Sequence, residues 1–299
     1  MSNPSSIRKW MAARAHFDYC INCAAFTNTK AIESSDEGSD LSWMLNALAP
    51  KALGEVCTSM KTKLLHVSTD YVFSEKLVQY SFSEKLGQYS KVDNVDFPSR
   101  GFRSSDSPFP CNVYGNHKLV GELLLKDAMR DWPMWIVMRV SWLYGMHNNK
   151  SFVHKFMKNV VKSIKDGTFE VKMTDDEFSI PTSTKFVIDY IEEVLQCDNA
   201  KMFGRVKHVV PGYESNMVSR LQFAEAILKN YTSSLDSEKF LVDGHSISEV
   251  KLVGVKSTGH QPKFSYMEDF GTIGKWDYYL ELFMKANKKE ILDWAIANT

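Results

Sequence analysis

The residue pair with the clearest chemical potential is Tyr114 and Lys118, four positions apart in the segment Tyr114-Gly-Asn-His-Lys118. Residues four apart on a helix lie on one face, so the phenol and the ammonium are predicted to be neighbours. A neighbouring ammonium favours the phenolate and lowers the pKa of the tyrosine. The pair therefore predicts that Tyr114 is a general acid or base, although this spacing alone is more often an exposed helix pair without chemistry.

Hydroxyl groups upstream of this pair strengthen the prediction. Ser68-Thr69-Asp70-Tyr71 closes the apolar, β-branched run Leu64–Phe73, which is typical of a strand that runs into a loop. A hydroxyl at that strand end could hold the carbonyl group of a substrate within reach of the Tyr114 phenol.

The elements around these residues predict how they are positioned. Strand-like runs at 18–25, 64–73 and 135–145 alternate with helical patterns at 41–60 and 119–129. This alternation indicates βαβ units in a doubly wound, Rossmann-like α/β fold, with ligands beyond the carboxyl ends of the parallel strands. The second half adds amphipathic helices at 152–164, 182–195 and 219–228.

We predict two domains from this organisation. Residues 1–150 form the cofactor-binding domain, and residues 151–299 form mainly a smaller substrate domain, from which the segment at about 182–212 returns to the first. Ser74–Ser81 (SEKLVQYS) is repeated as Ser83–Ser90 (SEKLGQYS). This duplication is predicted to be either a tolerated surface insertion or a loop that alters substrate access.

The composition argues against two classes of partner. The 299 residues contain 36 Lys plus Arg and 36 Asp plus Glu, so the formal net charge is zero. Neither a nucleic acid nor an anionic membrane is favoured by that balance. No run approaches the roughly 18 apolar residues of a membrane span, and residues 1–14 lack a secretory signal core.

The cysteines favour a reducing compartment, so we expect a cytoplasmic protein. Five scattered cysteines in a chain of this length do not form a disulfide framework. Cys20 and Cys23 form a CxxC pair inside an apolar run without a second pair. We therefore predict strand thiols and no metal site.

Several longer sequence segments, and the order in which they occur along the chain, resemble one protein family. They are NCAAFTN (22–28), LNALAP (45–50), HVSTDYVF (66–73), NVYGNHKLVGE (112–122), RVSWLYG (139–145) and DDEFSIPTS (175–183). Together they resemble the dTDP-4-dehydrorhamnose reductases, which are extended short-chain dehydrogenases/reductases. The resemblance covers about residues 12–230.

The resemblance implies an oxidoreductase that uses NADPH or NADH to reduce the 4-keto group of a nucleotide-linked 6-deoxy sugar, in dTDP-L-rhamnose synthesis. It implies that Thr69 binds the C4 carbonyl and that Tyr114 donates the proton. Lys118 would bind the nicotinamide ribose and tune Tyr114. The partner would be the nucleotide sugar, and a homodimer is left open.

The resemblance also implies binding residues. Ala24 and Ala25 would line the cofactor, because small side chains permit a close approach. Asp70, Tyr71 and Trp142 would contact the substrate. The alternatives are a loop or capping carboxylate for Asp70 and a core aromatic for Trp142.

One departure from the family concerns the start of the fold. Such reductases begin with a strand, a glycine-rich turn and a helix, whereas the first glycine here is Gly38. We therefore expect a sheet without its first βαβ unit. Three explanations are possible: the gene sequence is incomplete, an unrelated segment supplied elsewhere replaces the unit, or the protein is catalytically silent. We favour the first. The alternative functions are a regulatory subunit like that of methionine adenosyltransferase and a nucleotide-sugar epimerase.

Overall fold

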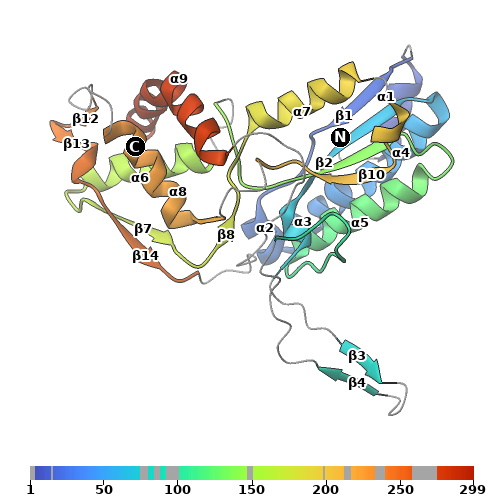
Figure 1. Cartoon of the computed structure of the whole chain (residues 1–299), viewed down its shortest axis with the longest axis horizontal. Coiled ribbons are helices and arrows are strands. Elements are labelled where there is room, and N and C mark those ends of the chain that lie inside the picture. The colour runs from blue at the N-terminus through green and yellow to red at the C-terminus, as the bar shows by residue number, and fades with distance from the viewer. Residues whose placement is uncertain are drawn as a thin grey trace. The chain divides into compact units, whose positions relative to one another are not determined.

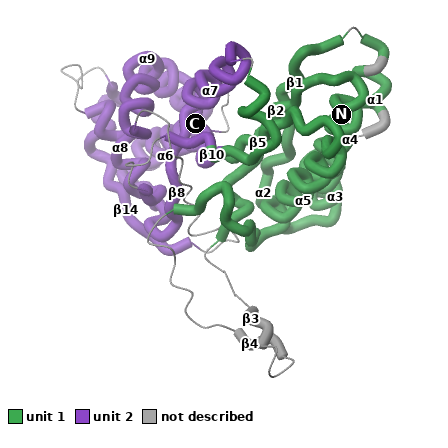
Figure 2. The backbone as a smooth tube through the Cα atoms, turned by 45° about the vertical axis from the view of Figure 1, so that its right-hand side comes forward, with its two compact units in different colours: residues 1–139, 199–208, 260–268 green, residues 140–198, 209–259, 269–299 purple. Residues whose placement is uncertain are grey.

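The computed structural model describes residues 4–14, 16–74, 80–83, 88–91, 101–146, 151–197, 199–211, 217–232, 240–257 and 275–299. The chain divides into two compact units (Figure 2). Unit 1 consists of residues 1–139, 199–208 and 260–268, and unit 2 consists of residues 140–198, 209–259 and 269–299. No helix in the described ranges is both long and apolar enough to cross a bilayer.

A four-stranded sheet forms the centre of unit 1, in the order β1-β2-β5-β10. Its strands are β1 (Tyr19–Asn22), β2 (Lys63–Thr69), β5 (Trp135–Val140) and β10 (Arg205–His208). β1 pairs in parallel with β2, and β10 pairs in parallel with β5. All six residues of β5 are buried, as expected for a strand covered on both faces. The predicted α/β class with a parallel, Rossmann-like sheet is confirmed.

Helices on this sheet make the core of unit 1 (Figure 1). They are α1 (Pro4–Ala12), α2 (Thr29–Ser34), α3 (Asp36–Ser42), a π-helix (Trp43–Leu48), α4 (Ala49–Met60), α5 (Val113–Ala128) and the 3₁₀ turns η2 (Asp70–Val72) and η3 (Ala200–Met202). Ile7, Val56 and Leu125 from three of the helices pack with Leu64 and Val137 from the sheet. This apolar cluster fixes α4 and α5 beside the strands.

Two glycines let α5 lie unusually close to neighbouring backbone. A Cβ at Gly115 would overlap the carbonyl oxygen of Tyr71, and a Cβ at Gly121 would overlap that of Asn46. Asn112 caps the helix, with its Oδ1 accepting from the Gly115 N–H at 2.7 Å. Gly115 therefore permits the close approach of α5 to the loop that follows β2, and Gly121 permits its close approach to the π-helix.

Unit 2 is built from short strand pairs and amphipathic helices. Its elements are β6 (Leu143–Tyr144), α6 (Phe152–Lys165), β7 (Glu170–Thr174), β8 (Phe178–Ser179), β9 (Thr182–Ser183), α7 (Thr184–Gln196), β11 (Val218–Ser219), α8 (Arg220–Thr232), β12 (Leu241–Val242), β13 (His245–Ser246), η5 (Ile247–Glu249), β14 (Lys251–Val255) and α9 (Trp276–Ala297). β6 pairs with β9 and β7 with β14 in parallel, whereas β8–β11 and β12–β13 are antiparallel. The helices predicted from residues 152, 182 and 219 onward are confirmed as α6, α7 and α8.

The duplicated segment contains a hairpin of β3 (Tyr80–Ser83) and β4 (Gln88–Lys91). The strands are antiparallel, and Ser81 of the first copy pairs with Ser90 of the second. Residues 75–79 and 84–87, which complete the two copies, lie outside the described residues. The effect of the duplication on substrate access stays a prediction.

Replacing Gly121 by Ala should destabilise the protein, because the new methyl group meets the Asn46 carbonyl. Overpacking of this kind costs about 1–3 kcal/mol, which outweighs the gain of about 1 kcal/mol in helix propensity. Urea unfolding of Gly121→Ala measures the loss. The control is Leu123→Ala at an exposed site on the same helix, which should change stability by about 0.5 kcal/mol or less. Equal effects of the two variants would contradict the close approach.

Candidate active site

The loop after β2 gathers polar side chains at the carboxyl end of the strand. Ser68, Thr69 and Asp70 are all buried there. The Thr69 hydroxyl accepts from the Tyr71 N–H at 3.2 Å and lies 3.1 Å from Asp70 Oδ1. The local hydrogen bonds close η2, so the Thr69 oxygen is held in one place instead of rotating freely.

The first turn of α5 brings Tyr114 to this loop. The rings of Tyr71 and Tyr114 meet edge to face with centroids 5.7 Å apart, and the phenol is hydrogen-bonded to Thr69. Glu33 Oε1 accepts from the backbone N–H groups of Val113 and Tyr114 at 2.8 and 3.3 Å. A carboxylate in this position accepts hydrogen bonds from the free N–H groups at the start of the helix, and its negative charge interacts favourably with the helix dipole.

Burial determines the protonation state of Tyr114. It raises the pKa of the phenol well above its ordinary value, and Asp70 raises it further, whereas the Thr69 hydrogen bond opposes the shift. The expectation of a lowered pKa for Tyr114 is therefore wrong for this structure, because burial dominates the shift. At neutral pH the phenol keeps its proton and is a hydrogen-bond donor.

Lys118 lies one turn further along α5 and is only 1% exposed. Its Nζ donates to the carbonyl oxygen of Val67 at 2.8 Å and lies 3.5 Å from Nε2 of His66. Burial lowers the pKa of Lys118 to about 8, although the charge of Glu122 opposes the shift. Lys118 can therefore change charge close to neutral pH.

A buried ion pair anchors α5 beneath these groups. Glu122 and Arg139 are 0% and 2% exposed, and the guanidinium binds the carboxylate through Nε at 3.0 Å and Nη2 at 2.7 Å. Ser68 Oγ donates to the same carboxylate at 2.6 Å. Burial raises the pKa of Glu122, but Arg139 and Ser68 outweigh it and hold the carboxyl below its usual pKa.

The predicted cofactor residues follow β1. Ala24 is exposed and Ala25 half-buried, so the backbone here is accessible to a ligand. The Ala24 N–H donates to Asn22 Oδ1 at 3.1 Å, and Asn46 binds both the N–H and the carbonyl of Phe26 at 2.9 and 2.8 Å. Two asparagines therefore fix the loop that carries the small residues, which fits the close approach of a nicotinamide cofactor.

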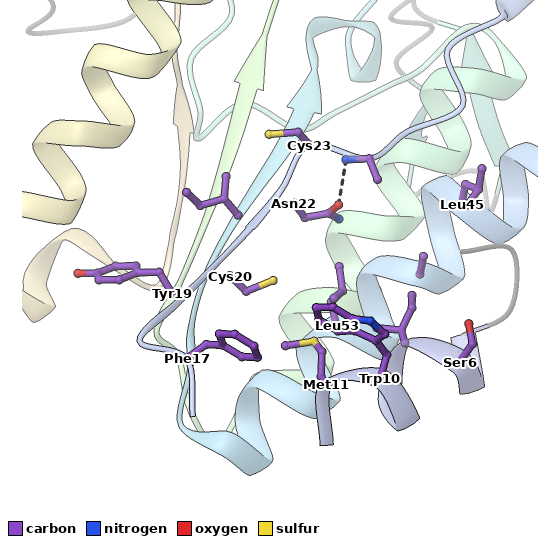
Figure 3. A pocket seen from close by; sticks show the side chains of 14 residues that line it. Ser6, Trp10, Met11, Phe17, Tyr19, Cys20, Asn22, Cys23, Leu45 and Leu53 are labelled. Atoms are coloured by element: carbon purple, nitrogen blue, oxygen red, sulfur yellow. Dashed lines mark hydrogen bonds between the residues drawn. The ribbon is translucent and has the colours of Figure 1, made fainter. Parts of the chain in front are cut away.

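A cavity of about 710 Å³ extends along β1 (Figure 3). Figure 3 shows Trp10, Met11 and Phe17 at one end and Asn22 and Cys23 at the other. Ala24 also lines it, so the cavity reaches the carboxyl end of the strand. Most of its lining is apolar, with Leu45, Ala49 and Leu53 contributed by the helical segment 43–60.

The cysteines near this cavity behave as packed thiols. Cys20 and the buried Cys57 are hydrogen-bonded to each other, and both are free thiols. Within the described ranges, no group of three or more His, Cys, Asp or Glu side chains could hold a metal ion.

Trp142 belongs to unit 2. Its backbone has a positive φ of 39°, and the Arg220 guanidinium stacks 3.6 Å from its ring centroid. Its backbone carbonyl accepts from the Thr182 N–H at 3.4 Å. Its contact with substrate, like those of Asp70 and Tyr71, stays a prediction.

Four side chains that hold the site were not predicted from the sequence: Asn22, Glu33, His66 and Glu122. Asn22, His66 and Glu122 lie inside the words NCAAFTN, HVSTDYVF and NVYGNHKLVGE. A buried histidine or carboxylate within a strand or helix pattern was the available signal, because such groups need partners.

Comparison with known proteins identifies a matching family and related proteins. The family model described as RmlD substrate binding domain matches residues 1–269. A dTDP-4-dehydrorhamnose reductase of Mycobacterium tuberculosis is 30% identical over 214 residues, which is 72% of this chain and 59% of that protein. The spore coat polysaccharide biosynthesis protein SpsK of Bacillus subtilis is 26% identical over 71% of this chain and 60% of its own length. The chain thus spans about three fifths of these relatives.

Solved structures share the fold. A dTDP-4-dehydrorhamnose reductase of Bacillus anthracis in complex with NADP superposes with a TM-score of 0.71 at 22% identity, over 96% of this chain and 86% of that one. A UDP-glucuronic acid 4-epimerase of Bacillus cereus, in complex with UDP-glucuronic acid and NAD, gives 0.63 at 17% identity, over 95% and 78%.

Removing Arg139 should destabilise unit 1, because Arg139→Met leaves Glu122 buried without its charged partner. We expect a loss of about 3–5 kcal/mol. The double variant Glu122→Leu/Arg139→Met should recover much of that loss, since no unpaired charge remains. Guanidinium unfolding of both variants measures the difference, and a double variant as unstable as the single one would argue against the ion pair as the cause.

Lys118→Met should stabilise the protein at pH 7. A lysine whose pKa is about 8 when folded and about 10.4 when unfolded disfavours folding while it is charged, by about 3 kcal/mol. Loss of the bond to Val67 offsets about 1 kcal/mol. Between pH 8 and about 10.4 the unfolded state binds more protons, so wild-type stability rises and the advantage of the variant shrinks.

Denaturant unfolding of Lys118→Met at pH 7, 8, 9 and 10 follows this change. The exposed Lys158→Met is the control and should show no such dependence. A stability difference for Lys118→Met that is constant across this pH range would contradict the lowered pKa.

Proposed function

We propose that this chain, which belongs to the RmlD substrate binding domain family, reduces the 4-keto group of a nucleotide-linked 6-deoxy sugar with NADPH. A dTDP-linked sugar is the proposed substrate, as in the names of several relatives, and dTDP-L-rhamnose synthesis is the proposed pathway. NADH is the alternative cofactor. The cofactor would supply the hydride to C4.

The contact between Thr69 and Tyr114 carries the proposal. The two hydroxyl groups lie together at the carboxyl end of β2, where a carbonyl oxygen could accept from both if the Thr69 hydroxyl turned to it from Asp70 Oδ1. Thr69 would bind the oxygen as negative charge develops on it, and Tyr114 would transfer its proton to that oxygen. The raised pKa of Tyr114 supports this direction of transfer, because the phenol is protonated at neutral pH.

Lys118 supports the same step from one turn away. As a cation it would stabilise the phenolate that remains after proton transfer. With a pKa of about 8, most of it is protonated at pH 7. The exposed backbone at Ala24 and the half-buried Ala25 fit a nicotinamide cofactor at the end of β1, and Lys118 would bind its ribose. Asp70, Tyr71 and Trp142 are the proposed sugar contacts.

The two alternative functions predict different outcomes with the same substrate. An epimerase of this fold would also use Tyr114, but it would consume no NADPH over a full turnover. A silent regulatory subunit would leave both the sugar and NADPH unchanged.

Tyr114→Phe should reduce the rate of NADPH oxidation with a dTDP-4-keto-6-deoxy sugar by about 10²- to 10⁴-fold, because the proton donor is removed and the ring still packs. Thr69→Val should also lower the rate, by up to about 10³-fold, because a hydrogen bond to the developing oxyanion is lost. The readout is NADPH absorbance at matched protein concentrations.

The control is Tyr278→Phe at an exposed position of α9, which should leave the rate unchanged. Near-normal turnover by Tyr114→Phe would show that the general acid is another group. Flat absorbance with the folded wild-type chain, tested with several nucleotide 4-keto sugars, would favour the silent regulatory protein.

A further inference from the structure

His66 is a buried titratable residue to which the proposed reaction gives no role. Its ring is fully buried in β2. Nδ1 lies 2.9 Å from Nδ2 of Asn22, and Nε2 lies 3.5 Å from Nζ of Lys118. The imidazole thus stands between an asparagine of β1 and the lysine of α5.

The neighbouring backbone fixes the orientation of the Asn22 amide. Asn22 Oδ1 accepts from the Ala24 N–H at 3.1 Å, which Figure 3 marks as a dashed line. A backbone N–H can only donate, so the oxygen end of the amide faces Ala24 and the NH₂ end faces His66. The amide is therefore the donor to His66 Nδ1, which must be the unprotonated nitrogen.

This assignment determines what His66 presents to Lys118. Burial lowers the pKa of His66 well below its ordinary value, and the Lys118 charge lowers it further, so the ring is neutral. A neutral imidazole with an unprotonated Nδ1 carries its hydrogen on Nε2. That N–H faces Nζ of Lys118. A neutral amine can accept a hydrogen bond from it, but an ammonium cannot.

The other ionisable groups that act on Lys118 do not favour the neutral amine. Glu122, on the same helix, favours the charged form, but its carboxylate is already bound by Arg139. Cys23, in the loop after β1, has a pKa raised by burial, so its thiol is neutral at pH 7. Among the residues that the structure describes, the contact with His66 is therefore the polar contact that opposes the ammonium, in addition to burial.

We propose that Asn22 and His66 are positioning residues for Lys118: Asn22 fixes the histidine tautomer, and the Nε2–H of His66 favours the neutral amine and orients it. In its neutral form the lysine is held at two points, by His66 and by the carbonyl of Val67. This Asn22–His66–Lys118 chain of contacts, called the relay below, sets the pH at which Lys118 changes charge. Its catalytic meaning rests on the proposed role of Lys118, but its geometry does not.

The tautomer can be measured directly in the free protein. Two-bond ¹H–¹⁵N correlation spectra of the chain labelled with ¹⁵N-histidine distinguish the two tautomers, and His66→Gln identifies the resonances. We expect His66 to be neutral at pH 7 with the hydrogen on Nε2. A hydrogen on Nδ1, or an imidazolium ring at pH 7, would overturn the proposal.

Asn22→Asp tests the effect on Lys118. The carboxylate still accepts from the Ala24 N–H but cannot donate, so it should draw the ring hydrogen to Nδ1. The Nε2 lone pair then accepts from the ammonium, and the pKa of Lys118 should rise by about one unit or more. The pKa is followed by NMR titration of isotope-labelled lysines, with Lys118→Met for assignment.

The matched control is Asn28→Asp. It introduces the same charge six positions away, where Asn28 Oδ1 caps α2 through the Ala31 N–H and an aspartate caps equally well. An equal pKa of Lys118 in the two variants would contradict the relay. If Asn22→Asp does not fold, the wild-type tautomer still decides the question. Neither measurement uses a cofactor or substrate, so an inactive chain would refute the proposed reductase without affecting this test.

Discussion

Glu122 is the charge on which the arrangement of unit 1 depends. It is fully buried and binds Arg139 of β5 through two hydrogen bonds and Ser68 of β2 through a third. A buried carboxylate is tolerated only if its oxygens are satisfied in this way. The interaction therefore requires β2, β5 and α5 to lie in one fixed arrangement. Ser68 is the residue before Thr69, so the same interaction fixes the strand end that carries the proposed carbonyl-binding hydroxyl.

The helix held by Glu122 carries two groups on which burial acts in opposite ways. Removal from water disfavours charge, so it keeps the Tyr114 phenol protonated and makes Lys118 easier to deprotonate. An acid that keeps its proton and a cation that titrates near pH 8 suit a reaction in which charge moves from a carbonyl to a phenol. The cost of burying Lys118 would be an example of stability given up at the proposed functional site.

Much of this organisation could be predicted from the sequence. The alternation of strand and helix patterns predicted the parallel sheet, and the four-residue spacing predicted that Tyr114 and Lys118 share one helix. The strand end at Thr69 was predicted from the β-branched run before it. These features are local, because each depends on residues close together in the chain.

The remaining features depend on contacts between distant segments. Burial of α5 reverses the expected pKa shift of Tyr114, and no spacing rule reports how deeply a helix is covered. The ion pair joins residues 17 positions apart in two different elements. The histidine tautomer depends on Asn22, 44 residues earlier, and on the backbone of Ala24. From the sequence, Gly121 is a residue of low helix propensity within a helix pattern. In the structure it is needed for the close contact with Asn46.

The most direct measurement of the central claim is the fate of the hydride. The wild-type chain is incubated with NADPH that carries deuterium at the transferred C4 position and with a dTDP-4-keto-6-deoxy sugar, and the product is examined by mass spectrometry and proton NMR. The account predicts one deuterium at C4 of the reduced sugar for each NADPH oxidised. An unlabelled sugar with its keto group intact, or an epimerised sugar formed without net oxidation of NADPH, would contradict it.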